Sequence, residues 1–442
     1  MRIPRGLVAL LAAAACAAPV SLSMAQTGGS VEGQAAVHLV EAEKHTAAGD
    51  YRAAIIELKN AVLEAPRSPR LRYRLGNVYA EIGDLGSAQK ELERAVDLDP
   101  EWIEARLALG EVWLSLGETD RVVNELWAAE APAGTQRAQV YVLHGLAQLE
   151  DGDIDAARES FRAALEEHPD DGPAYLGMAR AALAEGDLSM AELHLENAEQ
   201  GVGAEQAQVL RLKGDLALNR RDYGAAEEAF RKVVESNPHR AWARRDLARA
   251  LIELGKLDEA DRHLDEVLEA RPKDYDAVFL KGYSAYRQGD FASALERMSA
   301  VLAVADKFAP ALYVSGASAL AIGQNERARR DLGRFMQMEP ADRPGRRLYA
   351  EALLRLGDAS EAYTVLRPLA EARPGDPAVL ALLGTAAVMS GDVGAGLEHL
   401  ERAAALAPAD DGMRARVAAA RLAATEREEG LRELERLIQE QP

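Results

Sequence analysis

Histidine side chains are the first candidates for metal binding or proton transfer in this chain, which has eight of them. His194, His263 and His399 share one position in a repeating pattern, and each is followed by a leucine and an acidic residue. Packed neighbouring helices lie roughly 8–10 Å apart, so side chains several repeats from one another cannot share one ion. We therefore predict no metal site and expect these histidines to face solvent on the second helix of each repeat.

Other catalytic patterns are absent from the sequence. There is no His-Glu-x-x-His pair, no cysteine cluster and no phosphate-binding Gly-Lys-Ser/Thr loop. Gly201-Val-Gly203 lacks the third glycine and the strand of a dinucleotide site, and Ser315 lacks the preceding glycine of a nucleophile elbow. Acidic residues are numerous, but a solvated helix face explains them. The sequence predicts no catalytic residue, no cofactor and no enzyme.

Composition narrows the fold class and the kind of partner. Ala, Leu, Glu and Arg dominate while aromatic residues make up 5% of the chain, a composition that favours helices over sheets. The formal net charge of −20 opposes binding to the phosphates of nucleic acids. We expect an all-α protein whose partner is not a nucleic acid.

The amino terminus has the three parts of a secretory signal peptide. Arg2 and Arg5 precede the apolar run 6–20, and small residues near Ala25 suit cleavage before Gln26. No later apolar run approaches the roughly 20 residues of a membrane-spanning helix. We therefore predict a signal peptide over residues 1–25 and an exported chain, periplasmic or associated with the outer membrane.

Cys16 is the only cysteine, so no intramolecular disulfide can form. It lies inside the signal region, where Leu11-Ala-Ala-Ala-Ala-Cys16 loosely resembles a lipoprotein acceptor site. Two outcomes stay open: removal with the signal peptide after Ala25, or lipidation of Cys16. Membrane anchoring is expected only in the second case.

An internal repeat organises the rest of the sequence. Turn-forming pairs recur every 34 or 35 residues at Gly49-Asp50, Gly83-Asp84, Gly117-Glu118, Gly152-Asp153, Gly186-Asp187, Arg221-Asp222, Gly255-Lys256, Gly289-Asp290, Gly323-Gln324, Gly357-Asp358 and Gly391-Asp392. About half a period later a proline follows most of them, at Pro66, Pro100, Pro169, Pro238, Pro272, Pro340, Pro374 and Pro408. Glycine can adopt the left-handed conformation past a helix end, aspartate can cap the next helix, and proline stops the second one. Each period therefore predicts two helices.

Small residues recur where the two helices of a pair must approach closely. They include Gly76, Gly110, Gly145, Gly214, Gly282, Gly316 and Gly384 on the first helix and Ala54, Ala88, Ala157, Ala191, Ala226, Ala260, Ala294, Ala328 and Ala362 on the second. Leu75, Leu109 and their counterparts stand beside them at helical spacing. Arg221 and Thr425 replace the turn glycine, Gly396 replaces the small alanine, and Asp306 stands where proline is expected.

These features together resemble the tetratricopeptide-repeat (TPR) motif. The resemblance implies a right-handed superhelical solenoid of about twelve helix-turn-helix repeats over residues 35–442, after a flexible lead-in over residues 26–34. The last repeat, with its heavily charged outer face, is expected to cap the open end.

A partner is expected on the concave surface that the first helices form. The positions predicted to face it are unusually rich in aromatic and arginine residues in repeats six to nine: Arg211, Asp215, Trp242, Arg245, Arg249, Phe279, Tyr283, Tyr286 and Tyr313. Binding hot spots are built from such side chains. The alternative is that the rings fill gaps between repeats while the arginines pair with neighbouring acids.

The stretch from Gly49 to Leu92 resembles the opening of the bacterial PEP-CTERM-system TPR-repeat lipoproteins. That resemblance implies an assembly or sorting factor at the cell envelope, linked to exosortase and exopolysaccharide systems. Two function classes stay open beside it: a periplasmic peptide-binding or chaperone-like module, and an accessory of an enzyme. No group of residues supports the last of these.

Overall fold

The computed structural model describes residues 30–201, 203, 206–238, 240–424 and 427–440. These residues form 24 α-helices and one short 3₁₀ helix, with no β-strand among them. The predicted signal peptide and Cys16 lie outside the described residues, as does Thr425. Within the described part, no helix has the length and apolar character needed to cross a membrane. The all-α solenoid of about twelve helix-turn-helix units is confirmed.

The chain divides into two compact units, one ending at Asn237 and the other beginning at Pro238. The amino-terminal unit contains α1 (Ser30–Ala47), α2 (Tyr51–Glu64), α3 (Pro69–Glu81), α4 (Leu85–Leu98), α5 (Ile103–Leu116), α6 (Thr119–Glu125), η1 (Ala128–Glu130), α7 (Thr135–Asp151), α8 (Ile154–Glu167), α9 (Gly172–Glu185), α10 (Leu188–Gln200), α11 (Gln206–Asn219) and α12 (Tyr223–Ser236). The carboxy-terminal unit contains α13 (Ala241–Glu253), α14 (Leu257–Ala270), α15 (Tyr275–Gln288), α16 (Phe291–Leu302), α17 (Ala309–Ala321), α18 (Asn325–Met338), α19 (Arg343–Leu356), α20 (Ala359–Ala372), α21 (Pro377–Met389), α22 (Val393–Leu406), α23 (Asp411–Ala423) and α24 (Arg427–Glu440).

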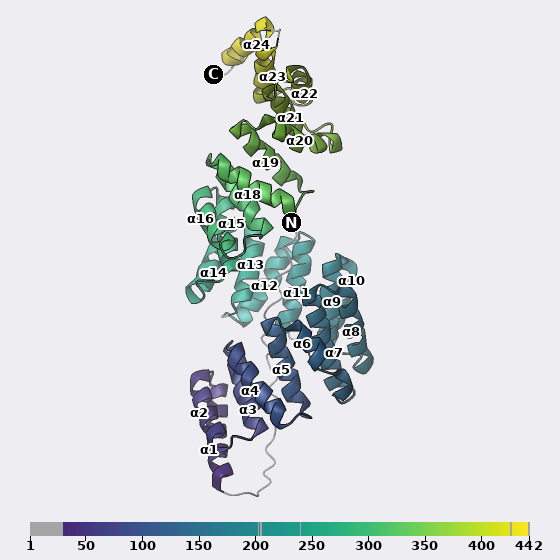
Figure 1. Ribbon diagram of the computed structural model, residues 1–442, viewed down its shortest axis with the longest axis vertical. Coiled ribbons are helices and arrows are strands. Elements are labelled where there is room, and N and C mark those ends of the chain that lie inside the picture. The colour runs from purple at the N-terminus through teal and green to yellow at the C-terminus, as the bar shows by residue number, and fades with distance from the viewer. Residues whose placement is uncertain (1–29, 202, 204–205, 239, 425–426, 441–442) are drawn as a thin grey trace. The chain divides into compact units, whose positions relative to one another are not determined.

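Consecutive helices pair into hairpins, and each hairpin packs on its neighbour within the same unit (Figure 1). The odd-numbered helices are the first helices of the hairpins and the even-numbered ones are the second. α1 begins at Ser30, so residues 30–34, which the sequence analysis assigned to the lead-in, belong to the first helix. The charged last helix α24 is present, and its role as a cap stays a prediction.

The hairpin turns form as the local chemistry predicts. Gly152 ends α7 in the left-handed conformation with φ +82°, and the Asp153 side chain accepts a hydrogen bond of 3.1 Å from the backbone N–H of Ala156. The same pair of devices recurs at Gly186 and Asp187. A left-handed residue reverses the chain, and the aspartate caps the free amides that open the next helix.

Arg221 occupies the turn position that glycine holds elsewhere, and it is the one non-glycine residue with positive φ among the described residues, at +61°. Its backbone therefore accepts the left-handed conformation although a Cβ atom disfavours it. The turn survives because Asp222 still caps α12 by accepting from Ala225 N–H.

Bulky second-helix side chains fill the holes that glycines leave on the first helices. Phe161 of α8 is fully buried, and a Cβ atom on Gly145 or on Gly177 would lie only 2.5 or 2.2 Å from its ring. Gly145 lies on α7 and Gly177 on α9, so one ring joins two consecutive hairpins. Gly145 stands at the repeating glycine position of the sequence, whereas Gly177 lies outside that position and was not predicted.

The third hairpin, formed by α5 and α6, has a shorter second helix than the other hairpins. α6 ends at Glu125 after seven residues, and a 3₁₀ turn follows over Ala128–Glu130. The indole N–H of Trp127 donates to the backbone carbonyl of Asn124, which removes an acceptor from any continued helix. Leu126 nevertheless stays buried against Gly110 and performs the packing role of a second-helix residue.

We expect Arg221→Gly to stabilise the amino-terminal unit by about 0.5–1 kcal/mol, because relief of the left-handed strain exceeds the extra chain entropy of glycine. The midpoint of urea denaturation measures this change. Gly186→Arg is the matched reverse substitution at φ +82° and should lower stability by about 1 kcal/mol. A lower midpoint for Arg221→Gly would contradict this account of the turn.

Candidate functional site

The histidines do not face solvent as freely as the sequence analysis expected, because all three are half-buried. The His194 ring stacks on Tyr175 with centroids 6.3 Å apart, and burial, together with Arg158, lowers the pKa of His194. His263 contacts the Arg244 guanidinium at 3.1 Å. No group of three or more His, Cys, Asp or Glu side chains in the described ranges could hold a metal ion.

Ser315 lies in the core of the carboxy-terminal unit. Its hydroxyl donates to Asp331 Oδ2 at 2.7 Å, and both side chains are buried. Asp331 also accepts from the Arg327 guanidinium at 3.4 Å. Fixed in the middle of α17 and shielded from solvent, this hydroxyl joins α17 to α18.

The nine residues predicted to bind a partner all lie on first helices and are all half-buried, but the two units divide them. The amino-terminal unit holds Arg211 and Asp215 on α11. The carboxy-terminal unit holds Trp242, Arg245 and Arg249 on α13, Phe279, Tyr283 and Tyr286 on α15, and Tyr313 on α17. The structure therefore brings them together as two groups.

In the amino-terminal unit, the structure adds Arg180 of α9 to Arg211 and Asp215. Burial, together with the charge of Arg211, lowers the pKa of Arg180 to about 10, while Asp215 opposes both effects. Arg180 Nη2 donates to Gln208 Oε1 at 3.3 Å. The Arg180 guanidinium is a donor group of the kind that binds an acidic group of a ligand.

Arg180 was missed by the sequence analysis although a signal was present. It stands six residues before its turn glycine, Gly186, as Arg249 stands before Gly255 and Tyr283 before Gly289. Because that offset recurs on one face of successive first helices, reading it along every repeat identifies Arg180.

In the carboxy-terminal unit, three rings of α15 form an aromatic row, which we define as Phe279, Tyr283 and Tyr286. Their centroids are 6.3 and 6.4 Å apart, with nearly parallel planes. Phe279 also meets Phe308 edge to face at 5.0 Å. The row packs against the core of the unit on one side and is part-exposed on the other, so it both fills a gap and presents ring surface.

Tyr313 of α17 extends this ring surface. Burial raises its pKa to about 12, and the nearby hydroxyl of Tyr286 contributes. The ring meets Phe335 at 5.3 Å between centroids. The Tyr313 phenol stays neutral at physiological pH and can donate a hydrogen bond to a ligand.

The hydroxyl of Tyr283, the middle ring of the aromatic row, belongs to a small polar group. It donates to Glu253 Oε1 at 3.2 Å, and Arg287 contacts the other Glu253 oxygen at 3.4 Å. Burial raises the pKa of Tyr283, while Arg287 opposes that change. Glu253 and Arg287, neither of which the sequence analysis selected, hold the ring in place across α13 and α15.

Arg245 and Arg249 lie one turn apart on α13 but have different surroundings. Arg245 Nη1 donates to Asp274 Oδ1 at 2.9 Å and to Asp276 Oδ2 at 2.7 Å, and its side chain is 13% exposed. Asp274 caps α15 by accepting from Ala277 N–H. Arg245 therefore fastens α13 to the start of α15, as the pairing alternative proposed. Arg249 makes no ion pair within 4 Å in the described part of the chain.

The arrangement suits recognition of another chain. In the carboxy-terminal unit, the part-exposed stacked rings offer rigid apolar surface, the phenols offer hydrogen bonds and Arg249 offers positive charge. In the amino-terminal unit, Arg180 offers positive charge. Side chains of these types form the anchors of protein interfaces.

Sequence comparison identifies the repeat. The sequence model of the tetratricopeptide repeat matches residues 45–112, 148–216, 217–281 and 319–385, which is more than half of the chain.

Two curated relatives share part of this repeat region. Cellulose synthase operon protein C of Pseudomonas fluorescens is 27% identical over 139 residues, which is 30% of this chain and 11% of that protein. Human trafficking protein particle complex subunit 12 is 25% identical over 157 residues, which is 34% of this chain and 21% of that protein. The chain thus spans about a tenth and a fifth of the lengths of these relatives.

Two solved structures are similar to this chain. The Cut9–Hcn1 hetero-tetramer of the APC/C has a TM-score of 0.48 and 15% identity, covering 92% of this chain and 87% of that one. PilW, a type IV pilus biogenesis factor, has a TM-score of 0.38 and 19% identity, covering 49% of this chain and 98% of that one.

We expect Arg245→Ala to destabilise the carboxy-terminal unit by about 2 kcal/mol, because it leaves the mostly buried Asp274 without its cation. Arg249→Ala, the matched control on the same helix, should change stability by less than about 0.5 kcal/mol. Chemical denaturation of both variants measures the difference. Equal losses would show that Arg245 does not fasten α13 to α15.

Proposed function

The chain belongs to the tetratricopeptide-repeat family, and on that premise we propose that it is a non-catalytic scaffold that binds another protein or peptide at the bacterial cell envelope. Proteins of this family generally act as interaction scaffolds, and the family fold is typically non-catalytic. The proposal extends to assistance of exopolysaccharide or PEP-CTERM protein-sorting machinery.

The aromatic row carries this proposal. A ring buried on all sides only adds stability, whereas Phe279, Tyr283 and Tyr286 are fixed by the core yet keep part of their surface accessible. Rings that are already rigid lose little conformational entropy on binding. The concave groove formed by first helices is the surface that we propose for the partner, with Arg249 and Tyr313 contributing.

The envelope and polysaccharide parts of the proposal rest on separate support. The signal-like amino terminus favours export. The relative from Pseudomonas fluorescens is named as a product of a cellulose synthase operon, which is a polysaccharide system. The resemblance of residues 49–92 to the PEP-CTERM-system proteins agrees with this assignment.

A periplasmic peptide-binding or chaperone-like module is the second candidate. The observation that favours it is the guanidinium of Arg180 on the first helix α9, a donor group that suits a peptide carboxylate. A module of this kind would capture many unfolded clients, whereas a scaffold would bind one defined complex.

We expect the double substitution Tyr283→Ala and Tyr286→Ala to reduce recovery of the bound partner from envelope fractions by at least about tenfold, the loss typical of binding hot spots. Quantitative affinity purification measures recovery, and circular dichroism checks that helicity is kept. Arg262→Ala, on the second helix α14, is the control and should recover the partner normally. Undiminished recovery by the double variant would remove the aromatic row as the binding surface.

We expect the mature chain to begin at Gln26 if the signal peptide is cleaved after Ala25, and to begin at a lipid-modified Cys16 if that residue is the acceptor. Intact-mass measurement on protein from the envelope separates the two results. With cleavage after Ala25, Cys16→Ser leaves export and mature mass unchanged, whereas with lipidation it removes membrane association. Full-length protein retaining residues 1–25 in the cytoplasm would contradict export.

A further inference from the structure

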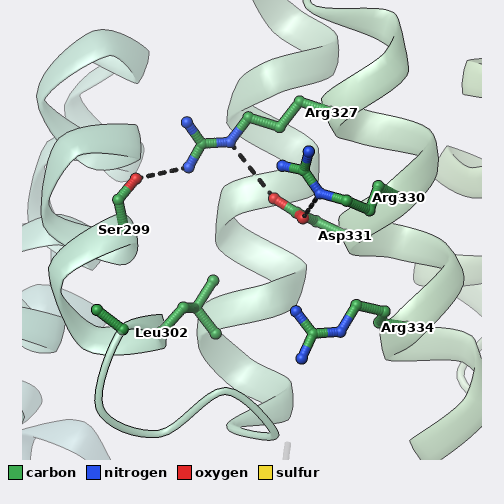
Figure 2. A pocket seen from close by; sticks show the side chains of 7 residues that line it. Ser299, Leu302, Arg327, Arg330, Asp331 and Arg334 are labelled. Carbon is green, nitrogen blue, oxygen red and sulfur yellow. Dashed lines mark hydrogen bonds and ion pairs between the residues drawn. The ribbon is translucent and has the colours of Figure 1, made fainter.

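A polar recess lies between the second helices α16 and α18 of the carboxy-terminal unit (Figure 2). Its volume is about 330 Å³. The lining side chains are Ser299, Leu302, Ala303, Arg327, Arg330, Asp331 and Arg334. Because second helices form it, the recess is not part of the first-helix surface proposed for the protein partner.

Asp331 organises the arginines of the recess. Its side chain is only 5% exposed, and it accepts from Ser315 on the core side and from Arg327 and Arg330 on the recess side. The Arg330 Nε atom lies 3.1 Å from Asp331 Oδ1. A buried carboxylate with several donors is held in one orientation and in turn fixes the guanidinium groups that it contacts.

The three arginines differ in how many hydrogen bonds their guanidinium groups donate to the protein. Arg327 is engaged with Asp331, Ser299 and Ser315. Arg334 donates through Nη2 to Asp306. Arg330 uses only Nε, and its side chain is 63% exposed, so its two terminal nitrogens have no protein partner within the described ranges.

The charges around the recess do not cancel. Arg327, Arg330 and Arg334 face Asp331 inside the recess and Asp306 at its rim, so one positive charge remains in excess. This excess stands out on a chain whose formal net charge is −20. The local field therefore favours an anion where the chain as a whole repels one.

The geometry selects the kind of anion. Arg330 and Arg334 are one helical turn apart on α18, and Figure 2 shows their guanidinium groups, like that of Arg327, directed toward the space beside α16. A planar carboxylate has two oxygens, which one arginine satisfies, whereas a tetrahedral oxyanion can accept from several guanidinium groups in different directions. We propose that this recess binds a tetrahedral oxyanion, a phosphate or sulfate group, through Arg330 and Arg334.

The full mature chain should bind inorganic phosphate saturably at constant ionic strength, measured by isothermal titration calorimetry. The double variant Arg330→Gln with Arg334→Gln should bind at least about tenfold more weakly, since charge-assisted hydrogen bonds are lost. Arg330→Lys keeps the charge but loses the forked donor geometry, and it should also bind phosphate more weakly than the wild type.

Arg367→Gln is the matched control, because Arg367 of α20 is 65% exposed and lies outside the recess. It should bind phosphate as the wild type does, and circular dichroism should show that all variants fold. Acetate and a short phosphoserine peptide complete the series: weak acetate binding supports a tetrahedral anion, and peptide binding tighter than that of phosphate indicates a group carried on a polypeptide. Equal phosphate binding by the double variant, no saturable binding by the wild type, or acetate binding equal to that of phosphate would each overturn the proposal.

Discussion

The structure depends on close contact between a bulky side chain of one helix and a glycine of the next. Phe161 shows it clearly, because its ring occupies space that a Cβ on Gly145 or Gly177 would need. Phe230 fills the corresponding space at Gly214. A hairpin cannot bury such a ring alone, so each repeat is stable only with a neighbour, and stability accumulates along the stack within each unit.

This packing also positions the residues proposed for binding. First helices turn one face toward the second helices and leave the other available, so residues at one repeat offset form a continuous surface within each unit. The aromatic row uses both faces of that arrangement, since its rings complete the core and keep accessible edges. Stability and recognition are therefore coupled at α15, where Arg245, Glu253 and Arg287 hold the row and its helix in place.

Arginine serves two purposes in this acidic chain. Arg245 donates to two aspartates and holds α13 against the start of α15. Arg330 instead uses only its Nε atom on Asp331 and directs its terminal nitrogens to the recess between α16 and α18. Acidic residues outnumber basic ones in the chain as a whole. An anionic group is therefore attracted to a place with exposed arginine and repelled elsewhere.

The sequence by itself determined the helices, their turns and the length of the repeat. Glycine past a helix end and aspartate at the next start act within a few residues, so their effect does not depend on distant contacts. Even Arg221, with its positive φ, lies where the period places the turn. The row of rings and arginines on the first helices was also predictable, because offset alone identifies a face.

Only the tertiary structure decided which of these side chains form contacts within the protein and which stay available to a partner. Arg245 and Arg249 were both predicted to face a partner, yet Arg245 pairs with acids 29 and 31 residues away on the next hairpin. The division of the nine predicted residues between two units and the burial of Asp331 against Ser315 likewise depend on how the helices pack. Contacts of this kind depend on distances between stacked helices, and a repeat period contains no information about those distances.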